Sequence, residues 1–165
     1  MGQERRGELE NQDLAELERG ASKTFDKILL NTGAREEVSD LSTSIEIDFD
    51  RNIISANRPQ QVGGSPRCQN EVLLDDKTRK EIEALYEDTQ LCVTVLRPEP
   101  DVLCTLVVLD NDYLKVFAGD DVQLDATLFG GLCGRSGPID EMCGRGEEFL
   151  EYLKALRTEV TSACN

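Results

Sequence analysis

The sequence predicts an α+β fold in which an antiparallel β-meander of four or five strands carries helices on one face. Two observations lead to this prediction. Short apolar runs follow one another in the second half of the chain, and their links are too short for the crossovers of about a dozen residues that parallel neighbours need. An amphipathic helical pattern then ends the chain and supplies a second layer to cover the sheet. The 165 residues are enough for one core domain preceded by a helical arm.

The first predicted element is the helix of that arm. Residues 12–30 place apolar side chains three and four residues apart, which is typical of an amphipathic helix, and Asn11 can cap its start. An isolated helix of this length is marginal in water, so its apolar stripe needs a surface to lie against. That surface is either the protein's own core or a partner. We assign the stripe to protein binding, through Leu14, Leu17, Ala21, Phe25 and Ile28.

An acidic strand and a polar connector follow the arm. From residue 44 to 49, Ile and Phe alternate with Glu and Asp, the pattern of a half-buried strand, and 50–52 form the expected turn. Residues 55–70 hold two prolines, two glycines and five Asn or Gln, the composition of an exposed connector. We therefore divide the chain into an arm, strand and connector over 1–62 and an α+β core domain over 63–165.

The predicted core domain opens with a capped helix. Leu73 and Leu74 form an apolar staple before Asp75, which is an N-cap for a helix over 77–88. Strands are then predicted at 91–97, 102–110, 113–119 and 122–129.

The last predicted element is an amphipathic helix that starts at residue 146. Glu147 and Glu148 lie in its first turn, where the helix dipole favours acidic side chains. Its apolar face consists of Phe149, Leu150, Leu153, Leu156 and Val160.

The excess of acidic over basic residues argues against several classes of function. The chain has 18 Lys and Arg against 33 Asp and Glu, a net charge of −15, which repels nucleic-acid backbones and anionic lipids. No apolar run is long enough to cross a membrane, and the first residues lack the apolar stretch of a signal peptide. Cys92 and Cys104 sit in apolar runs, where free thiols pack as small hydrophobes. We therefore expect a cytoplasmic protein without nucleic-acid binding or membrane insertion.

Acidic side chains gather at the expected turns of the sheet. Between residues 98 and 129, seven acids stand against one base, Lys115. In a meander they form acidic rims, which either keep the protein soluble or steer a basic partner to it. The residues of the predicted acidic rim are Asp101, Asp110, Asp112, Asp120 and Asp121.

The Cys-Gly-Arg repeat at Cys133 and Cys143 is the one candidate for thiol chemistry. The chain has no histidine, which removes the commonest general base and makes an ordinary zinc site depend on scattered cysteines. Arg135 and Arg145 follow the thiols, and nearby cations lower a thiol pKa. No nucleotide-binding glycine motif or calcium loop occurs, so no cofactor is predicted.

These observations together predict a non-catalytic, acidic protein-binding module, comparable to an adaptor or an escort chaperone. Its expected partner is a protein with a basic surface, and a homodimer is a further arrangement compatible with the arm. The alternative is a thiol-based redox or metal-binding protein centred on Cys133 and Cys143.

Overall fold

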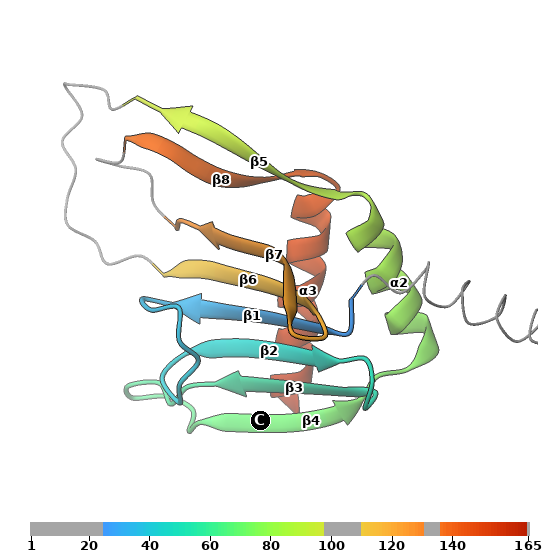
Figure 1. The fold of residues 1–165 in the computed structure, drawn as a ribbon. Helices are drawn as coiled ribbons and strands as arrows, with labels where there is room; N and C mark the ends of the chain where they lie inside the picture. The colour runs from blue at the N-terminus through green and yellow to red at the C-terminus, as the bar shows by residue number, and fades with distance from the viewer. Residues whose placement is uncertain (1–24, 98–109, 131–135, 165) are drawn as a thin grey trace, which may run out of the picture.

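A computed structural model describes residues 25–97, 110–130 and 136–164 (Figure 1). Over these residues the fold is α+β, with antiparallel strands and two α-helices, of which the second is the last α-helix described. In chain order the elements are β1 (Lys27–Gly33), β2 (Thr43–Asp48), β3 (Ile53–Arg58), β4 (Cys68–Leu73), α2 (Asp76–Glu87), β5 (Thr89–Leu96), β6 (Asn111–Ala118), β7 (Asp121–Leu128), β8 (Gly137–Gly144), α3 (Gly146–Thr161) and the 3₁₀ turn η1 (Ser162–Cys164).

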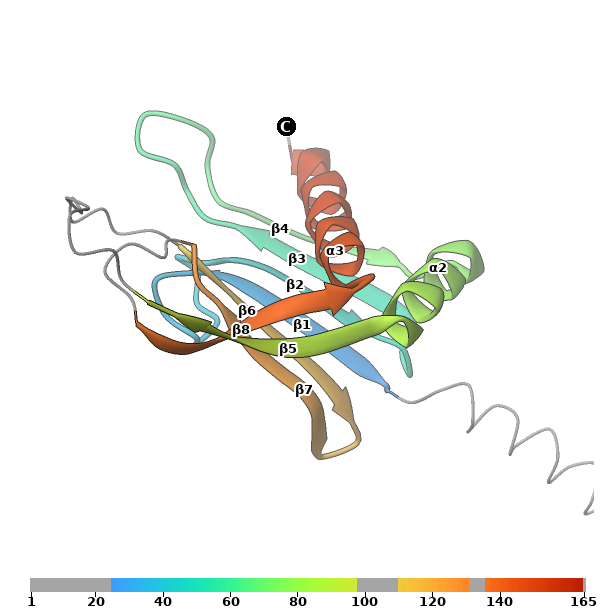
Figure 2. The ribbon, with the colours of Figure 1, turned by 90° about the horizontal axis from the view of Figure 1, so that it is seen from above.

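The described strands form two sheets. Six of them pair in the order β4-β3-β2-β1-β6-β7, and β5 pairs with β8 as a separate ribbon, all pairs being antiparallel. The ribbon lies beyond β7, so that β4 and β5 stand at opposite ends of the molecule (Figure 1). Both helices lie on the same side of the six-stranded sheet, as predicted (Figure 2). The strand order differs from the predicted four- or five-strand meander, because β1 enters between β2 and β6.

The core lies between the sheet and the two helices. Ile82 of α2 and Phe149 and Leu153 of α3 are fully buried against it. Because side chains alternate along a strand, each central strand turns every second residue toward the helices. The fully buried side chains of these strands are Ile28 and Leu30 in β1, Ile45 and Ile47 in β2, and Leu114 and Val116 in β6.

The two helices begin where the sequence indicates. Asp75 caps α2, and its carboxylate accepts a hydrogen bond of 2.7 Å from the backbone N–H of Thr78. Helix α3 begins at Gly146, and four of the five predicted apolar side chains of its face are buried, Leu156 being partly buried.

The helix predicted over residues 12–30 is wrong in its last part. Lys27–Gly33 is strand β1, and residues 12–24 lie outside the described part of the chain. Phe25 and Ile28 are buried in the core, where they contact the domain itself instead of a partner. Their three-residue spacing fits a helix, but pairing with β2 and β6 on both sides decides the local structure.

The polar connector predicted over 55–70 is shorter than expected. Strand β3 runs to Arg58 and β4 begins at Cys68, so that both ends of the predicted connector pair with each other. The boundary proposed between residues 62 and 63 falls in the β3–β4 connection, and strands from both sides of it belong to one sheet.

Of the four strands predicted in the second half, three are present as β5, β6 and β7, and the fourth, over 102–110, lies outside the described residues except for Asp110. Strand β5 pairs with β8, which the sequence did not predict. Strand β8 begins with Gly137 and Pro138, and a proline is tolerated at the beginning of a strand.

Candidate binding pocket between β4 and α3

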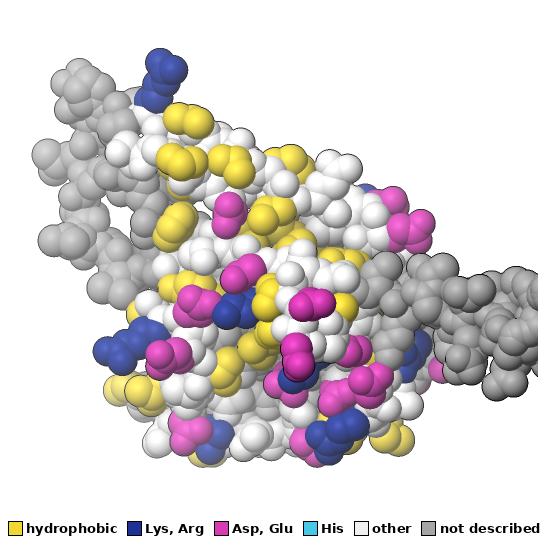
Figure 3. All heavy atoms as spheres, viewed as in Figure 1, with side chains coloured by type: hydrophobic (Ala, Val, Ile, Leu, Met, Phe, Trp, Pro, Cys, Tyr) yellow, Lys and Arg dark blue, Asp and Glu magenta, His cyan; other side chains and the backbone are white. Residues whose placement is uncertain are grey.

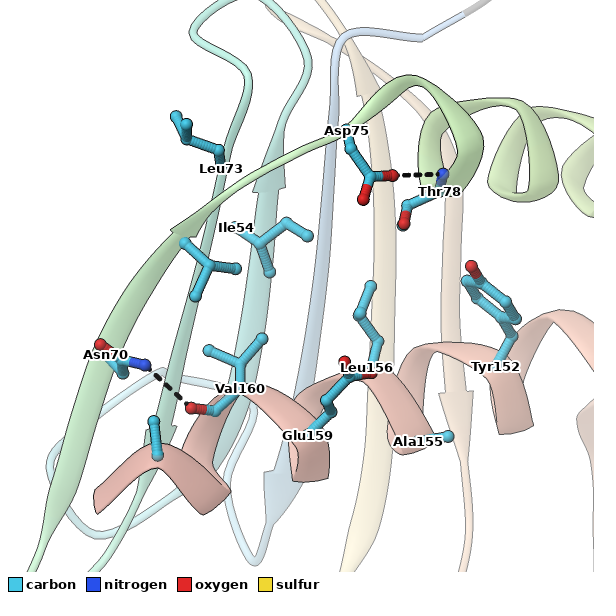
Figure 4. Close-up of a pocket in the computed structure, with 12 residues that line it drawn as sticks. Ile54, Asn70, Leu73, Asp75, Thr78, Tyr152, Ala155, Leu156, Glu159 and Val160 are labelled. Atoms are coloured by element: carbon cyan, nitrogen blue, oxygen red, sulfur yellow. Dashed lines mark hydrogen bonds between the residues drawn. The ribbon is translucent and has the colours of Figure 1, made fainter.

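A pocket of about 320 Å³ lies where β4, the start of α2 and the C-terminal half of α3 meet (Figure 4). We call it the β4–α3 pocket. The residues that line it are Ile54, Asn70, Val72, Leu73, Asp75, Thr78, Tyr152, Ala155, Leu156, Glu159, Val160 and Ala163.

Apolar side chains form the interior of the β4–α3 pocket. Ile54 of β3 and Val160 of α3 are buried, and Leu156 packs against the same core (Figure 4). Leu73, at the end of β4, is 80% exposed, so that an apolar side chain stands in solvent at the mouth. Burying such a side chain under a ligand removes apolar surface from water, which stabilises the complex.

The charged side chains around this apolar interior are all acidic. Asp75 and Glu159 bring carboxylates, while none of the 12 lining residues is Lys or Arg. The hydrogen bond from the Thr78 backbone holds the pKa of Asp75 below its ordinary value, so the carboxylate is ionised at neutral pH. The pocket therefore offers apolar contact together with negative charge.

Tyr152 contributes a neutral hydroxyl to the pocket. Burial, together with its hydrogen bond to the Glu81 carboxylate, raises the pKa of Tyr152 to about 12. The phenol consequently stays protonated at neutral pH, where it donates a hydrogen bond but does not act as a base.

One end of the pocket is fastened by a disulfide. Cys68 at the start of β4 is bonded to Cys164 just after α3, across a sequence separation of 96. Beside it, the Asn70 side-chain amide donates a hydrogen bond of 3.0 Å to the Val160 carbonyl. These links fix the end of α3 against β4, and they set the distance between the two walls of the pocket.

A buried arginine holds the middle of α3 to the sheet. Arg157 donates a hydrogen bond of 2.8 Å to the Thr32 hydroxyl and contacts the Thr43 carbonyl at 3.4 Å. Burial lowers its pKa, and the Asp112 carboxylate acts in the opposite direction. The helix wall of the pocket is thus anchored at two points, Arg157 and the Cys164 disulfide.

A larger hollow of about 750 Å³ lies on the opposite face, under the loop at 34–38. Lys115, which lines it, already forms an ion pair of 2.6 Å with Glu36. The side-chain amide of Asn31 donates to three backbone carbonyls of the same loop. Since the loop engages these groups itself, the β4–α3 pocket is the stronger candidate for a ligand.

The predicted acidic rim occupies both ends of β6. Asp110 lies at one end and Asp120 and Asp121 at the other, all exposed, whereas Asp101 lies outside the described residues. Asp112 is not a free rim group, because its carboxylate pairs with Lys154 at 2.7 Å and accepts a hydrogen bond from Thr32. None of these aspartates lines the β4–α3 pocket.

Of the five arm residues proposed for protein binding, only two lie in the described part of the chain. Leu14, Leu17 and Ala21 lie outside the described part of the chain, and Phe25 and Ile28 are core residues. The role of the first three in binding stays a prediction.

The expectation of a free, packing thiol is wrong for Cys92, which forms a disulfide with Cys143 across β5 and β8, while Cys104 lies outside the described residues. Of the two cysteines proposed for thiol chemistry, Cys143 is therefore bonded to Cys92, and Cys133 lies outside the described residues. Within the described ranges, no group of three or more Cys, Asp or Glu could hold a metal ion. A thiol-based role stays a prediction that these disulfides do not test.

The β4–α3 pocket was not predicted from the sequence, because strand β4 was not predicted. Asn70 and Leu73 fell in or beside the predicted connector, so they were not placed opposite α3.

Among the described residues, no helix is long and apolar enough to cross a membrane. Comparison of the chain with protein-family models, with curated proteins and with solved structures finds no match.

Proposed function

We propose that this protein is a non-catalytic binding module that recognises an apolar side chain flanked by Lys or Arg on a partner protein. The observation that carries the proposal is the lining of the β4–α3 pocket, with an apolar interior, two carboxylates and no cation. Its volume of about 320 Å³ accommodates one or two side chains of a partner.

The overall charge supports a basic partner. A net charge of −15 attracts cationic surfaces over a distance of about 8 Å at physiological ionic strength, which accelerates encounter. The exposed Asp110, Asp120 and Asp121 add to this attraction without contacting the pocket. Electrostatic attraction thus brings the partner close, and the pocket provides the specific contact.

A binding role is also favoured over catalysis by the groups present. The chain contains no histidine, and Tyr152 in the pocket has its pKa raised to about 12. The Asp75 carboxylate is held in its capping position by hydrogen bonds from the backbone and the side chain of Thr78. These groups suit recognition through hydrogen bonds and charge.

The compartment is part of the proposal. The sequence alone predicts a cytoplasmic protein, whereas disulfides form and persist mainly in oxidising environments. The Cys68–Cys164 and Cys92–Cys143 disulfides therefore favour an oxidising compartment over the reducing cytoplasm.

Peptide binding tests the proposal directly. The probe is a fluorescein-labelled peptide of about ten residues made of Lys, Leu and Ser, and in a matched peptide Glu replaces every Lys. We expect fluorescence polarisation to show saturable binding of the Lys peptide and roughly tenfold weaker binding of the Glu peptide, because the pocket carboxylates repel the latter.

A matched pair of variants locates the binding. Glu159→Lys reverses a charge in the pocket, and Glu87→Lys makes the same change in the last turn of α2, away from the pocket. We expect the first to weaken binding of the Lys peptide several-fold and the second to leave it nearly unchanged. Equal binding of both peptides, or equal effects of both variants, would contradict the proposal.

A further inference from the structure

We infer that β5 is the contact strand of a homodimer, in which it pairs antiparallel with β5 of a second copy. The starting observation is an exposed row of apolar side chains. Val93 and Val95 are 64% and 65% exposed, and Leu91 points to the same face because it is two residues away. Apolar side chains gather over β5 and β8 at the top of Figure 3. Such a row on a strand is typical of a protein contact.

Within the described residues, one edge of the β5 backbone is available for pairing. Strand β5 pairs with β8 on one side, and no other strand in the described ranges pairs with its second side. A strand in this position presents unpaired N–H and C=O groups that another strand can satisfy.

The charge distribution identifies a second copy as the occupant. Charged residues make up 31% of the chain, yet residues 89–96 contain none. Two copies of a chain with net charge −15 repel each other, so a contact between them is most favourable along a strand that carries no charge. By contrast, β4, at the other end of the molecule, carries Glu71. The carboxylate of Asp140, which stands opposite Val93 in β8, accepts a hydrogen bond of 3.4 Å from the Thr127 backbone N–H in β7.

The ends of β5 select the antiparallel arrangement. Asp88 directly precedes the strand and forms an ion pair of 3.8 Å with Arg145 of its own chain, and Arg97 directly follows the strand; both side chains are exposed. In an antiparallel pair with Val93 at the axis, Arg97 of one copy stands opposite Thr89 of the other, one residue from Asp88, whereas a parallel pair in register would put like charges opposite each other. This charge complementarity fits a two-fold symmetric dimer.

The spacing of the apolar row sets the register. With Val93 opposite its own counterpart, Leu91 of each copy stands opposite Val95 of the other, and all of these side chains share one face. Cys92 points to the opposite face, so its disulfide to Cys143 does not obstruct the contact and ties β5 to β8. The result is a four-stranded sheet in the order β8-β5-β5-β8.

The dimer is independent of the proposed peptide recognition. The β4–α3 pocket lies at the end of the molecule away from β5, so that dimerisation leaves both pockets open (Figure 1). A dimer would hence present two pockets to a partner that carries two binding segments.

Sedimentation equilibrium of the full chain tests the inference. We expect a mass of twice 18.3 kDa for the wild type. Val93→Lys should raise the dimer dissociation constant roughly tenfold or more, because two lysines meet at the two-fold axis. The matched control is Val122→Lys, which changes a valine that is 49% exposed in β7, and it should remain dimeric.

Hydrogen exchange of the wild type provides a second readout that needs no substitution. The β5 amides should exchange more slowly at high protein concentration than at low, while those of β4 should not change. A wild type that is monomeric at every concentration, or a Val93→Lys dimer as tight as the wild type, would overturn the inference. The monomeric Val93→Lys variant should still bind the Lys peptide. The dimer proposal and the peptide-recognition proposal can therefore be tested independently of each other.

Discussion

Strands β4 and β5 stand at opposite ends of the molecule, and each is fastened by a disulfide, yet their chemistry differs. Strand β4 contains Glu71, borders a pocket with carboxylates and is tied to the end of α3. Strand β5 has no charged residue, shows an apolar row and is tied to β8. The first end suits a basic partner, and the second suits an identical copy.

This difference shows how an acidic protein can separate two kinds of association. Under the two proposals, carboxylates at the β4 end disfavour contact between two copies, since like charges repel, and attract a cationic segment. The absence of charge at β5 removes that repulsion where two copies would join. The two ends can accordingly be perturbed one at a time.

The largest effect should come from removing the disulfides. Cys68→Ser with Cys164→Ser should cost about 2–5 kcal/mol of the free energy of unfolding, because a long loop of the unfolded chain is released. Cys92→Ser with Cys143→Ser should cost about half a kcal/mol less, as its sequence separation is 51 instead of 96. Urea denaturation measures both.

Peptide affinity distinguishes these two double variants further. The Cys68→Ser, Cys164→Ser variant should bind the Lys peptide more weakly, because the end of α3 is no longer held against β4. The Cys92→Ser, Cys143→Ser variant should bind it with unchanged affinity. A larger loss of peptide affinity in the Cys92–Cys143 variant would contradict the assignment of the pocket.

A smaller effect is expected from Tyr152 at alkaline pH. Its pKa is raised to about 12 from the ordinary value of 10.0, so its contribution to stability is present below pH about 10 and is lost as the pH rises through about 12. Melting temperatures measured across this range should fall less steeply for Tyr152→Phe than for the wild type. Tyr113→Phe, which lies outside the pocket, should follow the wild type, and identical slopes for all three proteins would count against this account.

The helices and hairpins could be predicted from local patterns. Asp75 and the apolar residues of α3 identify both helices, since capping and 3.6-residue spacing are properties of neighbouring residues. The alternation of Ile45 and Ile47 with acidic residues identifies β2 in the same way.

The remaining elements depend on contacts between distant residues. The apolar residues of β1, such as Ile28 and Leu30, are compatible with either a helix or a strand. The strand is chosen because β1 pairs with β2 on one side and β6 on the other. The polar residues of β4 indicated a loop, because its outward side chains face solvent. The pocket joins β4 to a helix about 90 residues later, as the Asn70–Val160 hydrogen bond shows, and such pairs leave no local signal.

The measurement that tests the central claim most directly is the affinity of the Lys peptide for Leu73→Lys and Val93→Lys. Both variants replace an exposed apolar side chain by the same cation, one at the mouth of the β4–α3 pocket and one on β5. We predict that Leu73→Lys weakens peptide binding roughly tenfold, while Val93→Lys stays within about twofold of the wild type. Equal losses in both variants, or a larger loss in Val93→Lys, would contradict the assignment of separate partners to the two ends.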